Sequence, residues 1–148
     1  MSDFQATITA LEQTMQEARN TARNAFLGEL KKVFANHPEL KVMTWAQYTP
    51  YFNDGDTCEF SVHDAYVSNY ETISPWGEWD DDEDEEPDDL VTIDLGYGRE
   101  AKQYPDLMAL NTFMKSQLGR DVLQFAFGDH VQIKVTATGI TVDEYDHD

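Results

Sequence analysis

Hydrophobic residues recur every three or four positions over the first quarter of the chain, the period of an amphipathic helix. This pattern predicts one helix from Phe4 to Phe34, capped by Ser2 or Asp3 and ended by Pro38. At 1.5 Å per residue the helix would be about 45 Å long, which is more than a small sheet can cover. Two arrangements follow with equal weight. Either the first half projects and packs against another copy of the chain, or the helix bends near Gly28 and folds wholly onto its own sheet.

The pattern changes to a period of two after Pro38, which is typical of strands with one buried face. Strands are predicted at Val42–Tyr48, Cys58–Val67 and Leu90–Leu95. The alternation of Val131–Ala137, the turn at Gly139 and the return of Ile140 and Val142 predict a final hairpin.

A second helix is predicted to open at Pro105 and to continue to Phe127, with Gly119 as a cap or kink. Its predicted buried stripe is Leu107, Leu110, Phe113, Met114 and Leu118. The expected fold class is α+β: an antiparallel sheet of four to five strands, with the long N-terminal helix and the second helix on one face. The whole chain, 1–148, is expected to form one domain with an acidic loop at about 69–89 and a frayed acidic tail at about 143–148.

Charge is the main functional clue, because 29 acidic residues face 10 basic ones and give a net charge of -19. Nine of the ten residues between Asp80 and Asp89 are carboxylates. Such a polyanion should be repelled by DNA, RNA and anionic lipid, so we expect no direct nucleic-acid partner and no membrane partner. The single Cys58 and the absence of a leader-like N-terminus favour the cytoplasm.

Catalytic and cofactor signatures do not occur in the sequence: there is no phosphate loop, paired CxxC, HExxH or GxSxG pattern. We therefore predict a non-enzyme with no cofactor, no metal and no catalytic residues. Cys58 and His63 fall on opposite faces of the predicted strand, so Cys58 is interpreted as a core residue and His63 as a solvent-facing one. A metal-dependent enzyme using Asp54, Asp56 or the 80–89 run remains a minor alternative.

The segment Trp45–Val62, with its WAQYTPYFNDGDTCEFSV sequence, resembles a stretch that recurs in small acidic proteins encoded by bacteriophages. The resemblance covers about an eighth of the chain and supplies no catalytic residues. It implies an accessory protein made in the host bacterial cytoplasm, where such proteins often block host factors or defence systems, some of them by mimicking the charge of DNA. Aromatic residues of this segment either anchor its loop to the sheet, which we favour, or form an exposed patch: Trp45, Tyr48, Tyr51 and Phe52.

The leading hypothesis is an inhibitor that binds a basic surface of a host or defence protein, such as a nucleic-acid-binding groove. The tryptophans beside the acidic run favour this interpretation over a loop that serves only for solubility, because indoles are frequent at interface hot spots. The alternative is a structural or assembly protein, with a homodimer formed through Phe4, Ile8, Leu11 and Met15. The predicted partner-binding residues are Trp76, Trp79, Asp80, Asp81, Asp82, Glu83, Asp84, Glu85, Glu86, Asp88 and Asp89.

Overall fold

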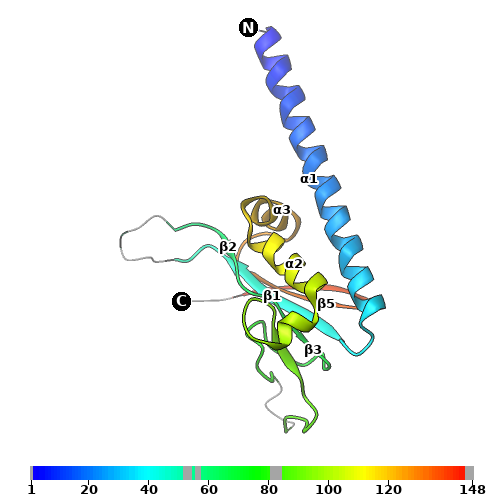
Figure 1. Cartoon of the computed structure of the whole chain (residues 1–148). Helices are drawn as coiled ribbons and strands as arrows, with labels where there is room; N and C mark the ends of the chain where they lie inside the picture. Colours follow the sequence, from blue (N-terminus) through cyan, green and yellow to red (C-terminus); the bar gives the residue numbers. More distant parts are fainter. Residues whose placement is uncertain (1, 52–54, 56–57, 81–84, 146–148) are drawn as a thin grey trace.

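The computed structural model describes residues 2–51, 55, 58–80 and 85–145 of the chain. Over these residues the fold is α+β, as the sequence predicts, with the helices on one face of an antiparallel sheet (Figure 1). The elements in chain order are α1 (Ser2–Asn36), β1 (Val42–Tyr48), β2 (Ser61–Val62), β3 (Tyr66–Ser68), β4 (Thr92–Asp94), the 3₁₀ helix η1 (Glu100–Gln103), α2 (Pro105–Lys115), α3 (Gln117–Phe127), β5 (Val131–Thr136) and β6 (Gly139–Glu144).

The sheet has the order β4-β3-β1-β5-β6, and the short β2 pairs with the end of β1. Its centre is β1, where Trp45 pairs with Ile133 of β5 and Met43 pairs with Val135. These four side chains lie on the face that the helices cover, because residues two apart in a strand share a face. The alternate residues of β1 and β5 lie on the opposite face, which is called the outer face below.

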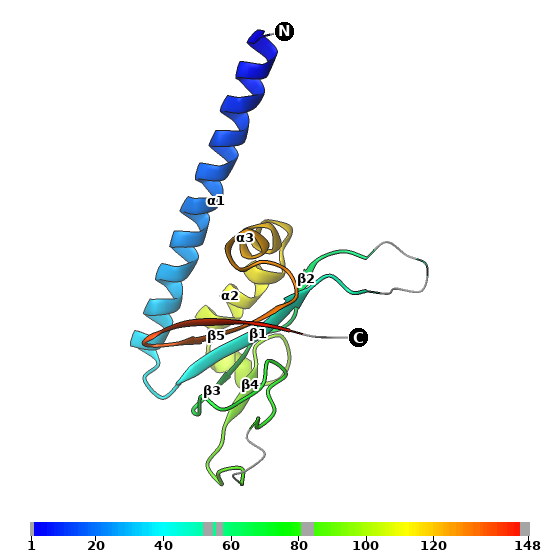
Figure 2. The ribbon, with the colours of Figure 1, turned by 180° about the vertical axis from the view of Figure 1, so that it is seen from behind.

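Helix α1 projects well beyond the rest of the molecule and is continuous through Gly28 (Figures 1 and 2). The projection predicted in the first arrangement is therefore confirmed, whereas its packing against another copy of the chain stays a prediction. Every described residue from Ser2 to Ala18 is exposed, and Arg19 is the first that is partly buried. Residues 2–18 are called the arm below, and the remainder of the chain is called the body.

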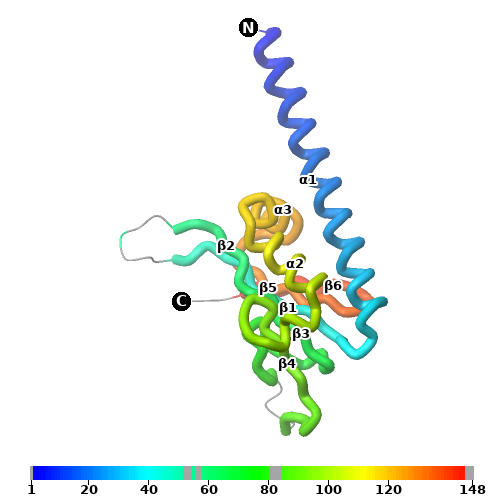
Figure 3. The backbone as a smooth tube through the Cα atoms, viewed as in Figure 1, coloured from blue at the N-terminus to red at the C-terminus, as the bar shows by residue number. Residues whose placement is uncertain are grey.

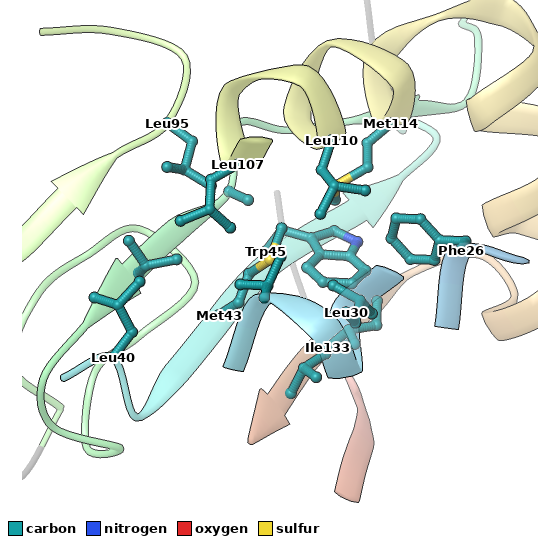
Figure 4. Close-up of a cluster of buried hydrophobic side chains, with 14 of the residues drawn as sticks. Phe26, Leu30, Leu40, Met43, Trp45, Leu95, Leu107, Leu110, Met114 and Ile133 are labelled. Carbon is teal, nitrogen blue, oxygen red and sulfur yellow. The ribbon is translucent and has the colours of Figure 1, made fainter. Parts of the chain in front are cut away.

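The hydrophobic core forms where the second half of α1 meets the sheet and α2 (Figure 4). The Trp45 side chain is fully buried at its centre and lies edge-on to Phe26 of α1, with 6.3 Å between ring centroids. Three of the five residues in the stripe predicted for the second helix are fully or almost fully buried: Leu107, Leu110 and Met114. The N-terminal half of α1 contributes nothing to this core, because its buried residues begin at Phe26.

The predicted second helix is two helices that change direction at Ser116, and this corrects the prediction for Leu118. The Ser116 hydroxyl accepts a hydrogen bond from the Gly119 amide at 3.0 Å and so caps α3. Since the new helix runs in a different direction, the stripe does not continue across the break. Leu118 is 63% exposed instead of buried.

The predicted strand Cys58–Val67 is also divided, because β2 ends at Val62 and β3 begins at Tyr66. The buried side chain of Asn111 on α2 accepts a hydrogen bond from the Ala65 amide at 2.9 Å, so this amide does not pair within the sheet. Cys58 is only partly buried and belongs to no strand, contrary to its interpretation as a core residue.

A buried glutamine in β1 fixes the position of α3 against the sheet. The Gln47 amide nitrogen donates to the carbonyl oxygens of Leu123 and Gly128 at 3.0 and 2.9 Å. Its carbonyl oxygen accepts from the Trp45 indole N–H at 3.0 Å. Gln47 has no exposed surface, so these bonds satisfy a polar group that would otherwise be costly to bury.

The C-terminal strand extends into the segment that the sequence analysis assigned to a frayed tail. Strand β6 continues to Glu144 at the sheet edge, and the Tyr145 amide donates to the His130 carbonyl at 2.8 Å (Figure 3). The prediction of fraying is therefore wrong for residues 143–145, while residues 146–148 lie outside the described chain. Pairing with β5 gives residues 143 and 144 a strand conformation, which the high local density of negative charge did not predict.

Candidate functional site: the acidic outer face

Negative charge is concentrated in the part of the chain that contains strands β1 to β4 and the loops between them. From Val42 to Gly98 the sequence contains 16 acidic residues and no lysine or arginine. These residues hold most of the net charge of -19, because the basic residues of the chain lie before or after them. Among the described residues the only basic side chain on the outer face of the three central strands is Lys134 of β5.

A segment of well-defined structure, residues 69–80, crosses this outer face and leads into the acidic run. The Ile73 side chain is fully buried, and a β-bridge joins Ile73 to Trp79. Lys134 donates to the Glu71 carbonyl oxygen at 2.8 Å. The single basic side chain of this face therefore holds the backbone of the segment. A hollow beside it, of about 220 Å³, is bordered by Thr44, Ile73, Pro75, Asp80, Gln132, Ile133, Lys134, Thr141 and Asp143.

Aromatic rings join the segment to the sheet. The Trp76 indole N–H donates to the Tyr145 hydroxyl at 2.6 Å, and the two ring centroids are 6.0 Å apart. The His63 ring lies between Tyr48 and Trp76, with centroid distances of 4.6 and 5.0 Å. His63 is thus partly buried in an aromatic cluster, which corrects its interpretation as a solvent-facing residue.

The two tryptophans beside the acidic run consequently have structural roles. Trp76 is 37% exposed and uses its N–H within the molecule, and Trp79 is partly buried with its ring edge-on to Tyr70 at 6.1 Å. Their presence beside the acidic run does not by itself indicate a partner, because both indoles have contacts within the fold. The exposed third of Trp76 remains available for contact.

The acidic residues at the described ends of the run are exposed. Asp80 follows the bridge at Trp79, and its amide donates to the Thr72 carbonyl at 3.3 Å. At the other end Asp89 accepts the Tyr70 hydroxyl at 2.6 Å, and this hydrogen bond raises the pKa of Tyr70. Glu85, Glu86 and Asp88 are exposed as well, whereas Asp81, Asp82, Glu83 and Asp84 lie outside the described residues. The two described ends of the acidic run are therefore held to the fold by these hydrogen bonds.

The aromatic residues of the segment that resembles phage proteins separate into different environments. Trp45 is in the core, Tyr48 is in the aromatic cluster and Tyr51 stacks on His130 with 4.8 Å between ring centroids. These contacts confirm the predicted anchoring role for Trp45 and Tyr48, whereas Tyr51 is 62% exposed although its ring stacks on His130. Phe52 lies outside the described chain, as do Asp54 and Asp56.

A polar cluster on the opposite side of the sheet was not found from the sequence. Lys115 and Asn111 of α2 both donate to Asp64 Oδ1, at 2.9 and 3.1 Å, at the border of a hollow of about 430 Å³. Burial works to raise the pKa of Asp64, but the two hydrogen bonds and the lysine charge outweigh it, so the pKa is lowered. An ionised aspartate paired with a lysine holds the β2–β3 turn against α2 and offers no activated nucleophile.

The described residues contain no group of three or more histidine, cysteine, aspartate or glutamate side chains arranged to hold a metal ion. Nor is any helix in the described ranges both long enough and apolar enough to cross a membrane. Comparisons of the chain with protein-family models, with curated proteins and with solved structures find no match. The resemblance to phage proteins therefore stays a prediction, and function has to be argued from the residues themselves.

Proposed function

We propose that the protein is a non-enzymatic, cytoplasmic binding protein whose acidic outer face docks on a positively charged surface of another protein. The observation that carries the proposal is the segment from Val42 to Gly98, which contains 16 acidic residues, the acidic run among them, and no lysine or arginine. Charge of one sign raises the rate of encounter with an oppositely charged surface and repels nucleic acid. The expected partner is a nucleic-acid-binding protein whose groove the acidic face occupies in place of DNA or RNA.

The anchored segment 69–80 supports this proposal over a role in solubility alone. A solvating insertion needs no bond to the fold, whereas this segment has a fully buried Ile73, a backbone bond to Lys134 and a hydrogen bond from Trp76 to Tyr145. Carboxylates held at fixed positions can match a fixed pattern of basic groups. The resemblance to phage proteins would make the partner a host or defence protein and the effect inhibition.

Affinity capture from bacterial lysate tests the proposal if it compares variants with equal net charge. The first variant, D80N/E85Q/E86Q/D88N, removes four exposed carboxylates of the acidic run. The matched control, D3N/E12Q/E17Q/E29Q, removes four exposed carboxylates of α1. Capture is carried out near 0.1 M salt, where the Debye length is about 10 Å, and again near 1 M, where it is about 3 Å.

The wild type and the α1 control are expected to capture the same basic protein at low salt, and the acidic-run variant is expected to lose it. High salt should weaken capture in every case, because the association is electrostatic. The purified target should then release labelled DNA or RNA when the wild-type protein is added. Equal losses in the two variants would show that only net charge matters, and binding that is insensitive to both salt and the acidic run would contradict the proposed docking surface.

A further inference from the structure

The arm carries an apolar stripe that none of the described residues of its own chain covers. Phe4, Ile8, Leu11 and Met15 are 62%, 38%, 54% and 55% exposed, although they occupy one face of a helix. Further along α1 the same stripe continues into Ala18 and Ala22, which face Leu118 and Val122 of α3. The stripe is therefore covered by the body at one end and exposed along the rest of its length.

We propose that a second copy of the chain covers this stripe, with the two arms packed antiparallel about a two-fold axis. The spacings along the stripe are four, three and four residues, so the pattern reads the same in both directions. In an antiparallel pair Phe4 lies opposite Met15 of the second copy and Ile8 lies opposite Leu11 of the second copy. Each apolar side chain then has an apolar neighbour, and the axis passes between Thr9 and Ala10.

The described part of the arm is long enough for this register. The exposed residues from Ser2 to Ala18 span about 25 Å, and the register places Ser2 of one arm opposite Glu17 of the other. Beyond Ala18 the Arg19 guanidinium forms an ion pair with Asp121 of α3 at 3.0 Å. The body thus blocks a longer overlap, and the two arms can overlap over their full exposed length in this register.

A small apolar groove at the base of the arm would receive the tip of the other arm. This groove, of about 190 Å³, is lined by Met15, Ala18, Arg19, Ala22, Leu118, Asp121 and Val122. Helical side chains lean towards the N-terminus of their helix, so Phe4 of the second copy would lean towards this groove. The pairing would therefore cover Leu118, which the helix break at Ser116 leaves 63% exposed.

Charge selects the antiparallel orientation over the parallel one. The arm carries three of the 29 acidic residues, Asp3, Glu12 and Glu17, so the remaining 26 acidic and 10 basic residues give the rest of the chain a net charge of -16. Parallel arms would hold two such bodies side by side. Antiparallel arms hold them at opposite ends of the pair, farther apart than the Debye length of about 8 Å at physiological salt.

Sedimentation velocity on the full chain, over about a hundredfold range of protein concentration, tests self-association. The wild type is expected to form a dimer, and the variant I8E/L11E is expected to weaken dimerisation by more than about 100-fold, because it places charges in the apolar seam. The matched control T9E/Q13E adds two glutamates outside the stripe, on the opposite side of the arm, and should remain dimeric. Circular dichroism and tryptophan fluorescence establish that both variants are folded.

Disulfide trapping tests the orientation in a C58S background. A protein carrying F4C, mixed with one carrying M15C, should form a mixed disulfide, because the paired Cα atoms would approach the roughly 5.5 Å that a disulfide needs. F4C alone should not crosslink, since the two copies of residue 4 would be about 16 Å apart. A monomeric wild type, a dimer that I8E/L11E leaves intact, or ready crosslinking of F4C to itself would each overturn the proposal. None of these results depends on the basic partner, so failure here and failure of the acidic-face proposal are distinguishable.

Discussion

Replacing Gln47 by methionine should destabilise the fold more than any single hydrogen bond would suggest. Methionine has nearly the same length and volume as glutamine, so the change leaves packing intact and removes only the polar contacts. Three hydrogen bonds disappear together: the two to the Leu123 and Gly128 carbonyl oxygens, and the one from the Trp45 indole N–H. Two of them join β1 to α3 and to the residue that follows it, and the third links Gln47 to Trp45 within β1.

The expected decrease in the free energy of unfolding follows from the net contribution of each hydrogen bond. A typical intramolecular hydrogen bond contributes about 1 kcal/mol, and a buried donor left without an acceptor costs about 1–3 kcal/mol. The loss of three hydrogen bonds, with the Trp45 indole N–H left without an acceptor, should lower the free energy of unfolding by about 3 kcal/mol. This value allows for a partial offset from the greater hydrophobicity of methionine. With a urea m value of about 2 kcal/mol/M, the midpoint should fall by about 1.5 M.

Equilibrium urea unfolding, followed by tryptophan fluorescence and far-UV circular dichroism, measures this loss. The Gln124→Met variant makes the same chemical change at an exposed position of α3 and should lie within about 0.5 kcal/mol of the wild type. Unfolding of each protein at two concentrations separates the intrinsic stability from any contribution of self-association. A loss below about 1 kcal/mol for Gln47→Met would refute the view that this glutamine secures α3 on the sheet.

Two further results are expected from the same unfolding assay. Gly119→Ala should lower the free energy of unfolding by at least about 2 kcal/mol, because a Cβ atom at this position would overlap the Phe113 carbonyl oxygen. Gly28→Ala should raise the free energy of unfolding by about 0.5–1 kcal/mol, since nothing lies within 4 Å of its added Cβ. Equal effects of the two substitutions would contradict the close approach of α2 and α3. Burial works to raise the pKa of Asp129, but its hydrogen bonds from the Thr49 hydroxyl and amide outweigh this, so the folded pKa lies below the usual value of 3.8. The ionised carboxylate therefore stabilises the protein above about pH 5, and this contribution is lost as the pH falls through the folded pKa. The difference in the free energy of unfolding between the wild type and Asp129→Asn should consequently shrink from about pH 5 to pH 3. A difference that is constant with pH would show that the carboxylate charge is not involved.

The parts of the fold that the sequence predicted well depend on local periodicity. The stripe of α1, the start of α2 at Pro105 and the hairpin that turns before Gly139 each repeat one pattern over many residues. Such repetition reports the period of the element directly, because burial of one face selects it. Local patterns also located the acidic run and the exposed stripe of the arm, the two features on which the proposals depend.

Two of the errors arise where a distant side chain decides the local structure, and one arises from a local cap. Asn111 takes the Ala65 amide and divides a predicted strand, although it lies 46 residues further along the chain. Ser116 caps α3 and ends the stripe that Leu118 was expected to continue. Tyr145 is ordered through Trp76 and His130, although the surrounding sequence is strongly acidic. The contacts of Asn111 and Tyr145 join residues that are far apart in the sequence, whereas the Ser116 cap is a local contact that the hydrophobic period does not reveal.

By itself the sequence determined the fold class, the extent of the N-terminal helix and the strong excess of negative charge, because composition and periodicity are properties of neighbouring residues. Only the tertiary structure decided that half of α1 projects as an exposed arm and that the indoles beside the acidic run attach residues 69–80 to the sheet. It also brought Asp64, Asn111 and Lys115 together. The physical reason is that burial and hydrogen bonding depend on which elements meet in space, and that meeting is settled by the packing of the whole chain.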